Sequence, residues 1–340
     1  MGVWGLRPQP PEALSASDRH MSEMRAQLVA TAEALFPAAP DWLALADAGF
    51  PFLLVSERQG GFGGDWGDAE AILRVAGATA LAQPIGEAMV ALALPETARW
   101  PHDGRLPALA AQVEGVVSAD RFTGTLRAVP WGREAGQVLA DCNGRLLLLP
   151  VADHITPGTS PAGEPRDTLH YDNVPVQCVG HGDLLAMGAF VRVAQSAGAL
   201  AAALDLAVAH VNTRVQFGKP LARLQAVQQA LAVLASEVAA LGMASAALAR
   251  ALDAGDASFE IPAAKLRANL AITRGVAIAH QVHGAIGFTR DYPLHPLTRR
   301  LMGWRSDFGS DAFWADRLGT LAVTAGGAGL WEDITRRGDR

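Results

Sequence analysis

Lysine and cysteine are scarce in this 340-residue sequence. Lysine occurs only at Lys219 and Lys265, and the two cysteines are Cys142 and Cys178. Two thiols are too few for a metal cluster, and nothing in the sequence requires a disulfide between them. The formal net charge is −6 at pH 7, and no block of basic residues occurs. The sequence therefore predicts no nucleic-acid partner, no bound metal and no contact with a membrane surface.

Long clean apolar runs are also missing. The run AGALAAALDLAVAHV is interrupted by Asp205 and His210, whereas a membrane helix needs roughly 20 predominantly apolar residues. Such runs therefore predict buried helices. The N-terminal stretch MGVWGLRPQPPEA has no long apolar segment, so we expect no signal peptide and a cytoplasmic location.

Half of the residues are apolar and 18% are charged, which is typical of a folded chain. The length exceeds that at which one hydrophobic core stops growing, so several subdomains are expected. Helical periodicity indicates a helical domain over residues 1–108. Short β-type runs separated by Gly, Pro and Asn-Gly turns predict a small antiparallel sheet over 109–180. Long Ala-rich helices predict an antiparallel four-helix bundle over 181–340.

Gly60, Gly61, Gly63 and Gly64 form a glycine cluster near the end of the first predicted helical segments. A phosphate-binding loop would follow a strand and end in a GK[ST] pattern, and neither feature is present. The cluster is therefore interpreted as a loop between helices.

Four segments resemble the acyl-CoA dehydrogenase family in the right order along the chain. They are WLALADAGFPFLLVSERQGGFGG (42–64), LHYDNVPV (169–176), RVQFGKPLARLQAVQ (214–228) and QVHGAIGFTRDYPLHPLTRR (281–300). The resemblance implies an N-terminal helical domain, a middle β-domain and a C-terminal four-helix bundle. It also implies FAD as cofactor, an acyl-CoA substrate and electron-transferring flavoprotein as electron acceptor, with the flavin supplying the redox chemistry.

The same resemblance assigns cofactor contacts to individual residues. Arg214 matches the arginine that reaches the FAD pyrophosphate of a neighbouring subunit, as the fork of a guanidinium can do with two charge-assisted hydrogen bonds. Phe217 and Gln225 match the aromatic residue and the glutamine beside it. Gln281, Gly284 and Ala285 match the segment that approaches the adenosine part of the same cofactor. His283 lies in that segment and is expected to be a core or cofactor-side histidine.

The middle domain departs from the family pattern. The family's Thr-Glu-Pro…Gly-Ser-Asp segment, which supports flavin and CoA, has no counterpart between Leu106 and Arg121. Of the following Trp-Ile-Thr motif, only Trp131 matches. The resemblance therefore implies a reduced β-domain that holds its own FAD poorly.

The catalytic glutamate is also missing. Counting forward from GFTRDYPL places Phe308 at the usual glutamate position. Some members carry the base on the first bundle helix, near Ala189, yet no glutamate lies between Glu164 and Glu237. Asp307 is the candidate substitute, but its side chain is one methylene shorter than that of glutamate. Its position, one residue earlier on a helix, also rotates the side chain by about 100°. Both Asp307 and Asp311 are therefore interpreted as solvated charges at a helix start.

Three hypotheses follow. In the first, the chain is the non-catalytic subunit of an α2β2 acyl-CoA dehydrogenase, of the kind used on steroid side chains, and donates FAD contacts to a base-bearing partner. In the second, it is a homo-oligomeric dehydrogenase with Asp307 or Asp311 as base. In the third, it is a flavin-free scaffold or binding subunit. Small residues on the first bundle helix, such as Gly188 and Ala189, indicate either room for a bulky acyl group or close helix packing.

Overall fold

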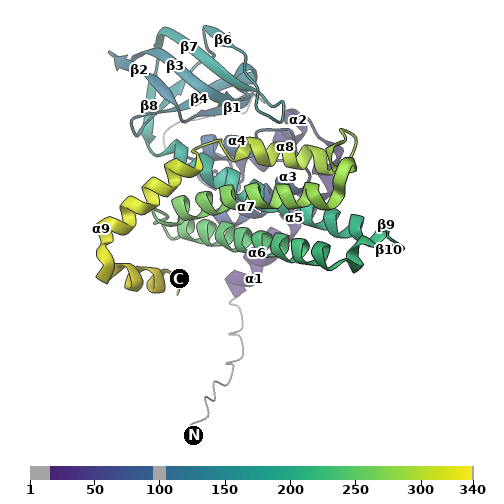
Figure 1. The fold of residues 1–340 in the computed structure, drawn as a ribbon. Coiled ribbons are helices and arrows are strands. Elements are labelled where there is room, and N and C mark those ends of the chain that lie inside the picture. Colours follow the sequence, from purple (N-terminus) through teal and green to yellow (C-terminus); the bar gives the residue numbers. More distant parts are fainter. Residues whose placement is uncertain (1–15, 95–104, 339–340) are drawn as a thin grey trace.

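The computed structural model describes residues 16–94 and 105–338 (Figure 1). The segment on which the absence of a signal peptide was predicted, residues 1–13, lies outside them. A β-domain occupies one end of the molecule, and helices from both ends of the chain form the rest.

The helices that precede the β-domain are joined by short 3-10 turns. They are α1 (Ala16–Leu35), α2 (Trp42–Asp47), α3 (Trp66–Ala78) and α4 (Ile85–Ala93), with η1 (Phe36–Ala38), η2 (Phe50–Phe52) and η3 (Glu57–Gln59) between them. The glycine cluster lies between η3 and α3, as predicted for an interhelical loop. Asp65 caps α3 by accepting a hydrogen bond from Asp68 N at 2.7 Å, which satisfies a free amide at the helix start.

The middle domain consists of two four-stranded sheets rather than the single small antiparallel sheet predicted from the sequence. One sheet has the order β1-β4-β5-β8 and the other β2-β3-β7-β6. The pair β1–β4 is parallel, because the hairpin that separates these strands in sequence belongs to the other sheet. The strands are β1 (Leu106–Ala110), β2 (Val113–Ser118), β3 (Arg121–Pro130), β4 (Ala135–Cys142), β5 (Arg145–Leu149), β6 (His154–Thr156), β7 (Arg166–Pro175) and β8 (Gln177–His181).

The C-terminal bundle is formed by three long helices and the shorter α8, which pack against one another (Figure 1). They are α5 (Leu184–Thr213), α6 (Gln225–Asp253), α7 (Glu260–His283) and α8 (Leu294–Trp304). The α3 helix of the first domain also packs on α5. A side chain at Gly77 of α3 would overlap with the backbone of Gln195, and one at Gly198 of α5 with that of Arg74. Small residues on α5 therefore serve close helix packing here.

The two longest bundle helices differ in burial. By length and composition, α5 and α6 could each span a membrane, and 83% of the apolar window of α5 is buried inside the fold but only 28% of that of α6. The prediction of a buried helix is therefore confirmed for α5. In α6, Leu234 and Leu241 are buried, and the exposed side carries mainly alanine, glutamine and serine.

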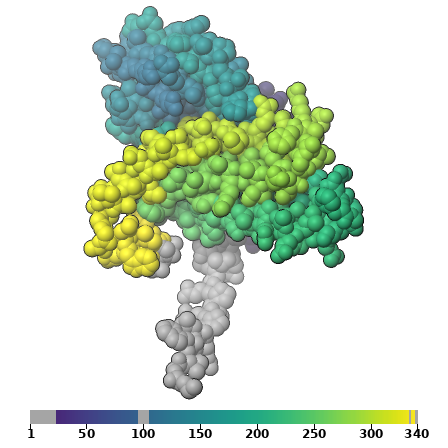
Figure 2. Space-filling view, viewed as in Figure 1, coloured from purple at the N-terminus to yellow at the C-terminus, as the bar shows by residue number. Residues whose placement is uncertain are grey.

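The last helix, α9 (Asp311–Gly338), is bent at Gly326, where φ is 73°. In Figure 1 its second half turns back beneath the bundle, and Arg337 there donates to Glu260 at the start of α7 at 3.0 Å. The space-filling view shows the C-terminal part of the chain, in yellow and yellow-green, along the boundary between the β-domain and the bundle (Figure 2). The segment between α8 and α9 thus lies where the two domains meet.

Candidate functional site

Arg214 and Phe217 lie on a short hairpin between α5 and α6. Arg214 ends α5 and donates its amide to His210 O at 2.9 Å. The strands β9 (Val215–Gln216) and β10 (Lys219–Pro220) are joined by Phe217 and Gly218 with φ of 54° and 74°. Positive φ at both turn residues gives the twist that a two-residue hairpin needs. The turn holds Phe217 84% exposed at the tip of the hairpin.

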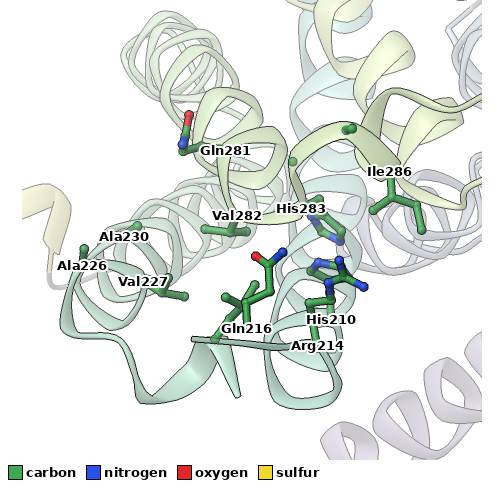
Figure 3. Close-up of a pocket in the computed structure, with 13 residues that line it drawn as sticks. His210, Arg214, Gln216, Ala226, Val227, Ala230, Gln281, Val282, His283 and Ile286 are labelled. Carbon is green, nitrogen blue, oxygen red and sulfur yellow. The ribbon is translucent and has the colours of Figure 1, made fainter. Parts of the chain in front are cut away.

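A cavity of about 590 Å³ lies beside this hairpin at the end of the bundle (Figure 3). Such a volume is within the range of small-molecule sites. Of the six residues expected to contact FAD, four line it: Arg214, Gln281, Gly284 and Ala285. The C-terminus of α5, the N-terminal turn of α6, the C-terminus of α7 and η6 (Gly284–Phe288) form its walls. Residues 67 positions apart in sequence, Arg214 and Gln281, therefore meet at one site.

The remaining two predicted residues flank the cavity. Gln225 is the first residue of α6 and precedes Ala226, which lines the cavity. Phe217 lies in the hairpin next to Gln216, which also lines it. Gly284 ends α7 with φ of 65°, and a side chain added there would meet no atom within 4 Å. The backbone at this corner is thus open to a bound group, which fits the close approach expected of a cofactor.

Two histidines form one wall of the same cavity. His283 is buried and His210 is half-buried, and their rings stack with centroids 4.8 Å apart. Burial, together with the nearby His283 and Arg214, lowers the pKa of His210. His283 had been expected to be a core or cofactor-side histidine, and it lies buried against this cavity. The sequence analysis assigned no contact to His210, which lies outside the matched segments, or to Gln216, which lies between Arg214 and Phe217 in one of them.

The expected base position is closed by packing. Phe308 follows α8 with φ of 54° and is 8% exposed. Its ring lies on Gly188 of α5, where an added side chain would overlap with it. Trp314 of α9 donates Nε1–H to Phe308 O at 2.9 Å and is fully buried. The space beside α5 is therefore filled by an aromatic ring.

Asp307 is not a solvated charge at a helix start, so the interpretation made from the sequence is wrong for this residue. Its carboxylate accepts from Arg166 Nη2 at 2.7 Å and from Arg192 Nε at 3.1 Å, and its side chain is 17% exposed. Burial by itself would raise the pKa of Asp307, but the charges and hydrogen bonds of Arg192 and Arg166 hold that pKa below its ordinary value. A carboxylate with a low pKa and two cationic partners is a weak base.

Asp311 has a different setting. It opens α9 and accepts from Arg305 Nη2 at 2.6 Å, with about a third of each side chain exposed. This hydrogen bond lowers the pKa of Asp311. The carboxylate therefore acts as a partly solvated ion-pair partner at a helix start, which agrees with its sequence interpretation.

The two arginines belong to a larger ion-pair network between the domains. Arg192 is 2% exposed and also pairs with Glu87 of α4. Its guanidinium lies 5.4 Å from the ring centroid of Phe308. Glu164 connects Arg166 to Arg300 of α8, with Arg300 Nε 2.9 Å from its carboxylate. The network ties the β-domain, α4, α5 and α8 together around the expected base position.

Little space remains where the β-domain meets this network. The cavity there, lined by residues that include Gln112, Arg127, Asp307 and Phe308, measures about 70 Å³. Small-molecule sites usually occupy roughly 300–1,000 Å³. This cavity beside Asp307 and Phe308 is too small for a flavin ring.

The helical, β and bundle domains in this order define the acyl-CoA dehydrogenase fold. Residues 182–318 match the family described as acyl-CoA dehydrogenase, C-terminal domain. This part of the chain is similar to the C-terminal domain of the acyl-CoA dehydrogenase family, and the described chain shares the fold of solved acyl-CoA dehydrogenases.

Similarity to individual proteins extends over most of the chain. It is 29% identical over 298 residues to acyl-CoA dehydrogenase FadE34 of Mycobacterium tuberculosis, a match that covers 83% of this chain and 42% of that protein. The chain spans only 32–42% of the length of the first curated relatives that it matches.

Solved structures show the same fold. A variant of the Tcur3481–Tcur3483 steroid ACAD superposes with a TM-score of 0.83 at 24% identity, covering 91% of this chain and 99% of the other. The ChsE4–ChsE5 complex from Mycobacterium tuberculosis gives 0.78 at 21% identity, covering 91% and 97%.

Proposed function

We propose that this chain is the non-catalytic subunit of a FAD-dependent acyl-CoA dehydrogenase with a base-bearing partner of the same family, in an α2β2 assembly. The supporting observation is a contrast within one chain. The expected base position is filled by Phe308 on Gly188, while the cavity beside Arg214 is open at the bundle end. This contrast supports a chain that holds part of a cofactor shared across an interface while a partner supplies the base.

The residues at the open cavity fit the adenosine diphosphate half of FAD. Arg214 offers a guanidinium to the pyrophosphate. The backbone of Gly284 and Ala285 leaves room for a close approach, and Gln281 offers an amide that can donate and accept. When bound, FAD supplies the two-electron acceptor for α,β-dehydrogenation of the thioester. This chain contributes binding and orientation, and the partner supplies the base.

The closed network explains why we assign the chemistry to the partner. A general base must reach the α-proton and have a pKa near the working pH. Asp307 meets neither requirement, because two arginines hold it and lower its pKa. Asp311 is paired with Arg305 and sits at the start of another helix.

The substrate we propose is a bulky acyl-CoA, with a steroid-derived side chain as the first candidate. The support is the fold similarity to a steroid ACAD. Electron-transferring flavoprotein remains the expected electron acceptor, and the cytoplasm remains the expected location.

The test is expression of the chain alone and together with a base-bearing family member encoded beside it. The expected result is colourless protein alone, and a complex with a flavin absorbance band and acyl-CoA dehydrogenase activity. A flavin-saturated, active homo-oligomer would establish the second hypothesis instead. A colourless, inactive complex would establish a flavin-free scaffold.

A further inference from the structure

The cavity at the bundle end contains a buried polar atom without a partner. His283 is 5% exposed, and its Nε2 has no hydrogen-bond partner among the residues that the structure describes. His283 lines the cavity (Figure 3). A buried polar group left without a partner costs free energy. An atom in this setting indicates a contact with a ligand that enters the cavity.

The hydrogen bond made by the other ring nitrogen, Nδ1, determines the tautomer of His283. Its Nδ1 lies 2.7 Å from Ala279 O. Because a carbonyl oxygen can only accept, Nδ1 must carry the hydrogen, and in the neutral ring Nε2 is then an acceptor. If the ring takes up a proton, Nε2 becomes a second donor.

The charged and titratable groups around His283 favour an anionic ligand. His210 of α5 stacks on it, Tyr292 contacts it edge-on at 5.2 Å, and Arg214 lines the same cavity. His280, one turn earlier on α7, is close enough for the two rings to interact electrostatically. None of the thirteen lining residues is acidic.

The start of α6 adds to the positive potential. Ala226 and Val227 in its first turn line the cavity, and no side chain of the described chain caps the helix start. The free amides and the helix dipole at the start of this 29-residue helix favour an anion.

We propose that His283 takes up one proton when a diphosphate-bearing ligand enters this cavity, and that its Nε2–H then donates to a phosphate oxygen. The proton comes from solvent, and no other bond forms or breaks. A bound anion favours the charged form of the ring, so affinity falls as pH rises.

The inference deepens the proposed function, since the ligand is the adenosine diphosphate half of the proposed cofactor. The experiment therefore uses ADP-ribose with the full chain alone, which needs no partner. ADP-ribose has no terminal phosphomonoester, whose second pKa of roughly 6 would obscure protein titration. Titration calorimetry at pH 7 in two buffers of different ionisation enthalpy gives the number of protons taken up.

The expected result is uptake of about one proton at pH 7 and an affinity that falls by up to about tenfold per pH unit, or up to about a hundredfold between pH 6 and pH 8, as one linked proton requires. His283→Gln should abolish the uptake. His210→Phe keeps a stacked ring without titration and should retain the uptake. His181→Gln, at an exposed residue of β8, is the matched control, and thermal melts check that each variant folds.

Binding without proton uptake, or uptake that disappears in His210→Phe but persists in His283→Gln, would overturn the inference. So would the absence of ADP-ribose binding at pH 6. The proposed function fails separately: a partner complex without flavin would refute it even where the isolated chain binds ADP-ribose with proton uptake.

Discussion

The ring of Phe308 lies directly on Gly188, so that any side chain at position 188 would occupy the space of that ring. The contact joins the loop after α8 to the first bundle helix. It occupies the place where the family resemblance expected a glutamate and its substrate. The predictions below test this contact, the charges around it and the open cavity at the other end of the bundle.

Gly188→Ala should destabilise the fold, because the added methyl group overlaps with the buried Phe308 ring. Overpacking of this kind costs about 1–3 kcal/mol, measured as the free energy of unfolding in urea. The matched control is Gly242→Ala on α6, where the added atom meets nothing within 4 Å. The control should gain about 0.4–1 kcal/mol from reduced freedom of the unfolded chain. Equal effects in the two variants would contradict the contact.

Asp307→Asn should cost about 3–5 kcal/mol, because it leaves two buried guanidinium groups with an uncharged partner. Asp311→Asn is the control, since its pair with Arg305 is about one-third exposed. An exposed pair of this kind contributes about 0–1 kcal/mol. Urea unfolding of both variants at pH 7 gives the comparison. A smaller loss for Asp307→Asn than for Asp311→Asn would refute a central role for the network.

Asp307 should also contribute to acid unfolding. Its pKa is lowered from the ordinary value of 3.8 in the folded chain. The stability that it provides is therefore complete above about pH 4–5 and is lost as pH falls through the folded pKa. In Asp307→Asn this part of the acid dependence should be absent. An unchanged acid profile would show that other carboxylates dominate.

Lys265 should make stability rise with pH above neutrality. It is 1% exposed, and its Nζ lies 2.7 Å from Asn269 Oδ1 and 3.1 Å from Trp304 O. Burial lowers its pKa from 10.5 to about 7. Between these values the unfolded chain binds more protons than the folded one, so the free energy of unfolding increases with pH.

The increase should approach about 1.4 kcal/mol per pH unit at most, measured by urea unfolding at pH 7, 8 and 9. Lys265→Met should flatten the slope. Lys219→Met changes the other lysine of the chain, which is exposed on β10, and should leave the slope as it is. A slope that survives in Lys265→Met would assign the titration to another group.

Arg214→Gln should reduce the flavin content of the partner complex, because the amide replaces the guanidinium expected at the pyrophosphate. A lost charge-assisted contact costs about 1.5–3 kcal/mol, or roughly tenfold or more in affinity. Because Arg214 is exposed in this chain, the variant should melt at the same temperature as the original protein. Arg223→Gln, at an exposed arginine of η5, is the control. Full flavin occupancy in the Arg214 variant would remove this residue from the proposed site.

The sequence determined the family, the order of the domains and the helical bundle, because long apolar periodicities and segments in register depend on neighbouring residues alone. It also predicted that Phe308 stands where the family carries its glutamate, since counting from a motif requires no coordinates. The assignment of Arg214 and Gln281 to one site rested on resemblance, and both residues line the same cavity in the structure.

Only the tertiary structure decided what surrounds these residues. The pairing of β1 with β4 depends on a crossover between two sheets, and no local pattern encodes it. Its sequence neighbours predicted Asp307 to be a solvated charge at a helix start. In the structure, Arg166 and Arg192 donate hydrogen bonds to it, although they lie 141 and 115 residues away in sequence. His283 acquires its stacked partner from α5 in the same way. Charge, burial and protonation depend on long-range contacts, and these exist only once the chain has folded.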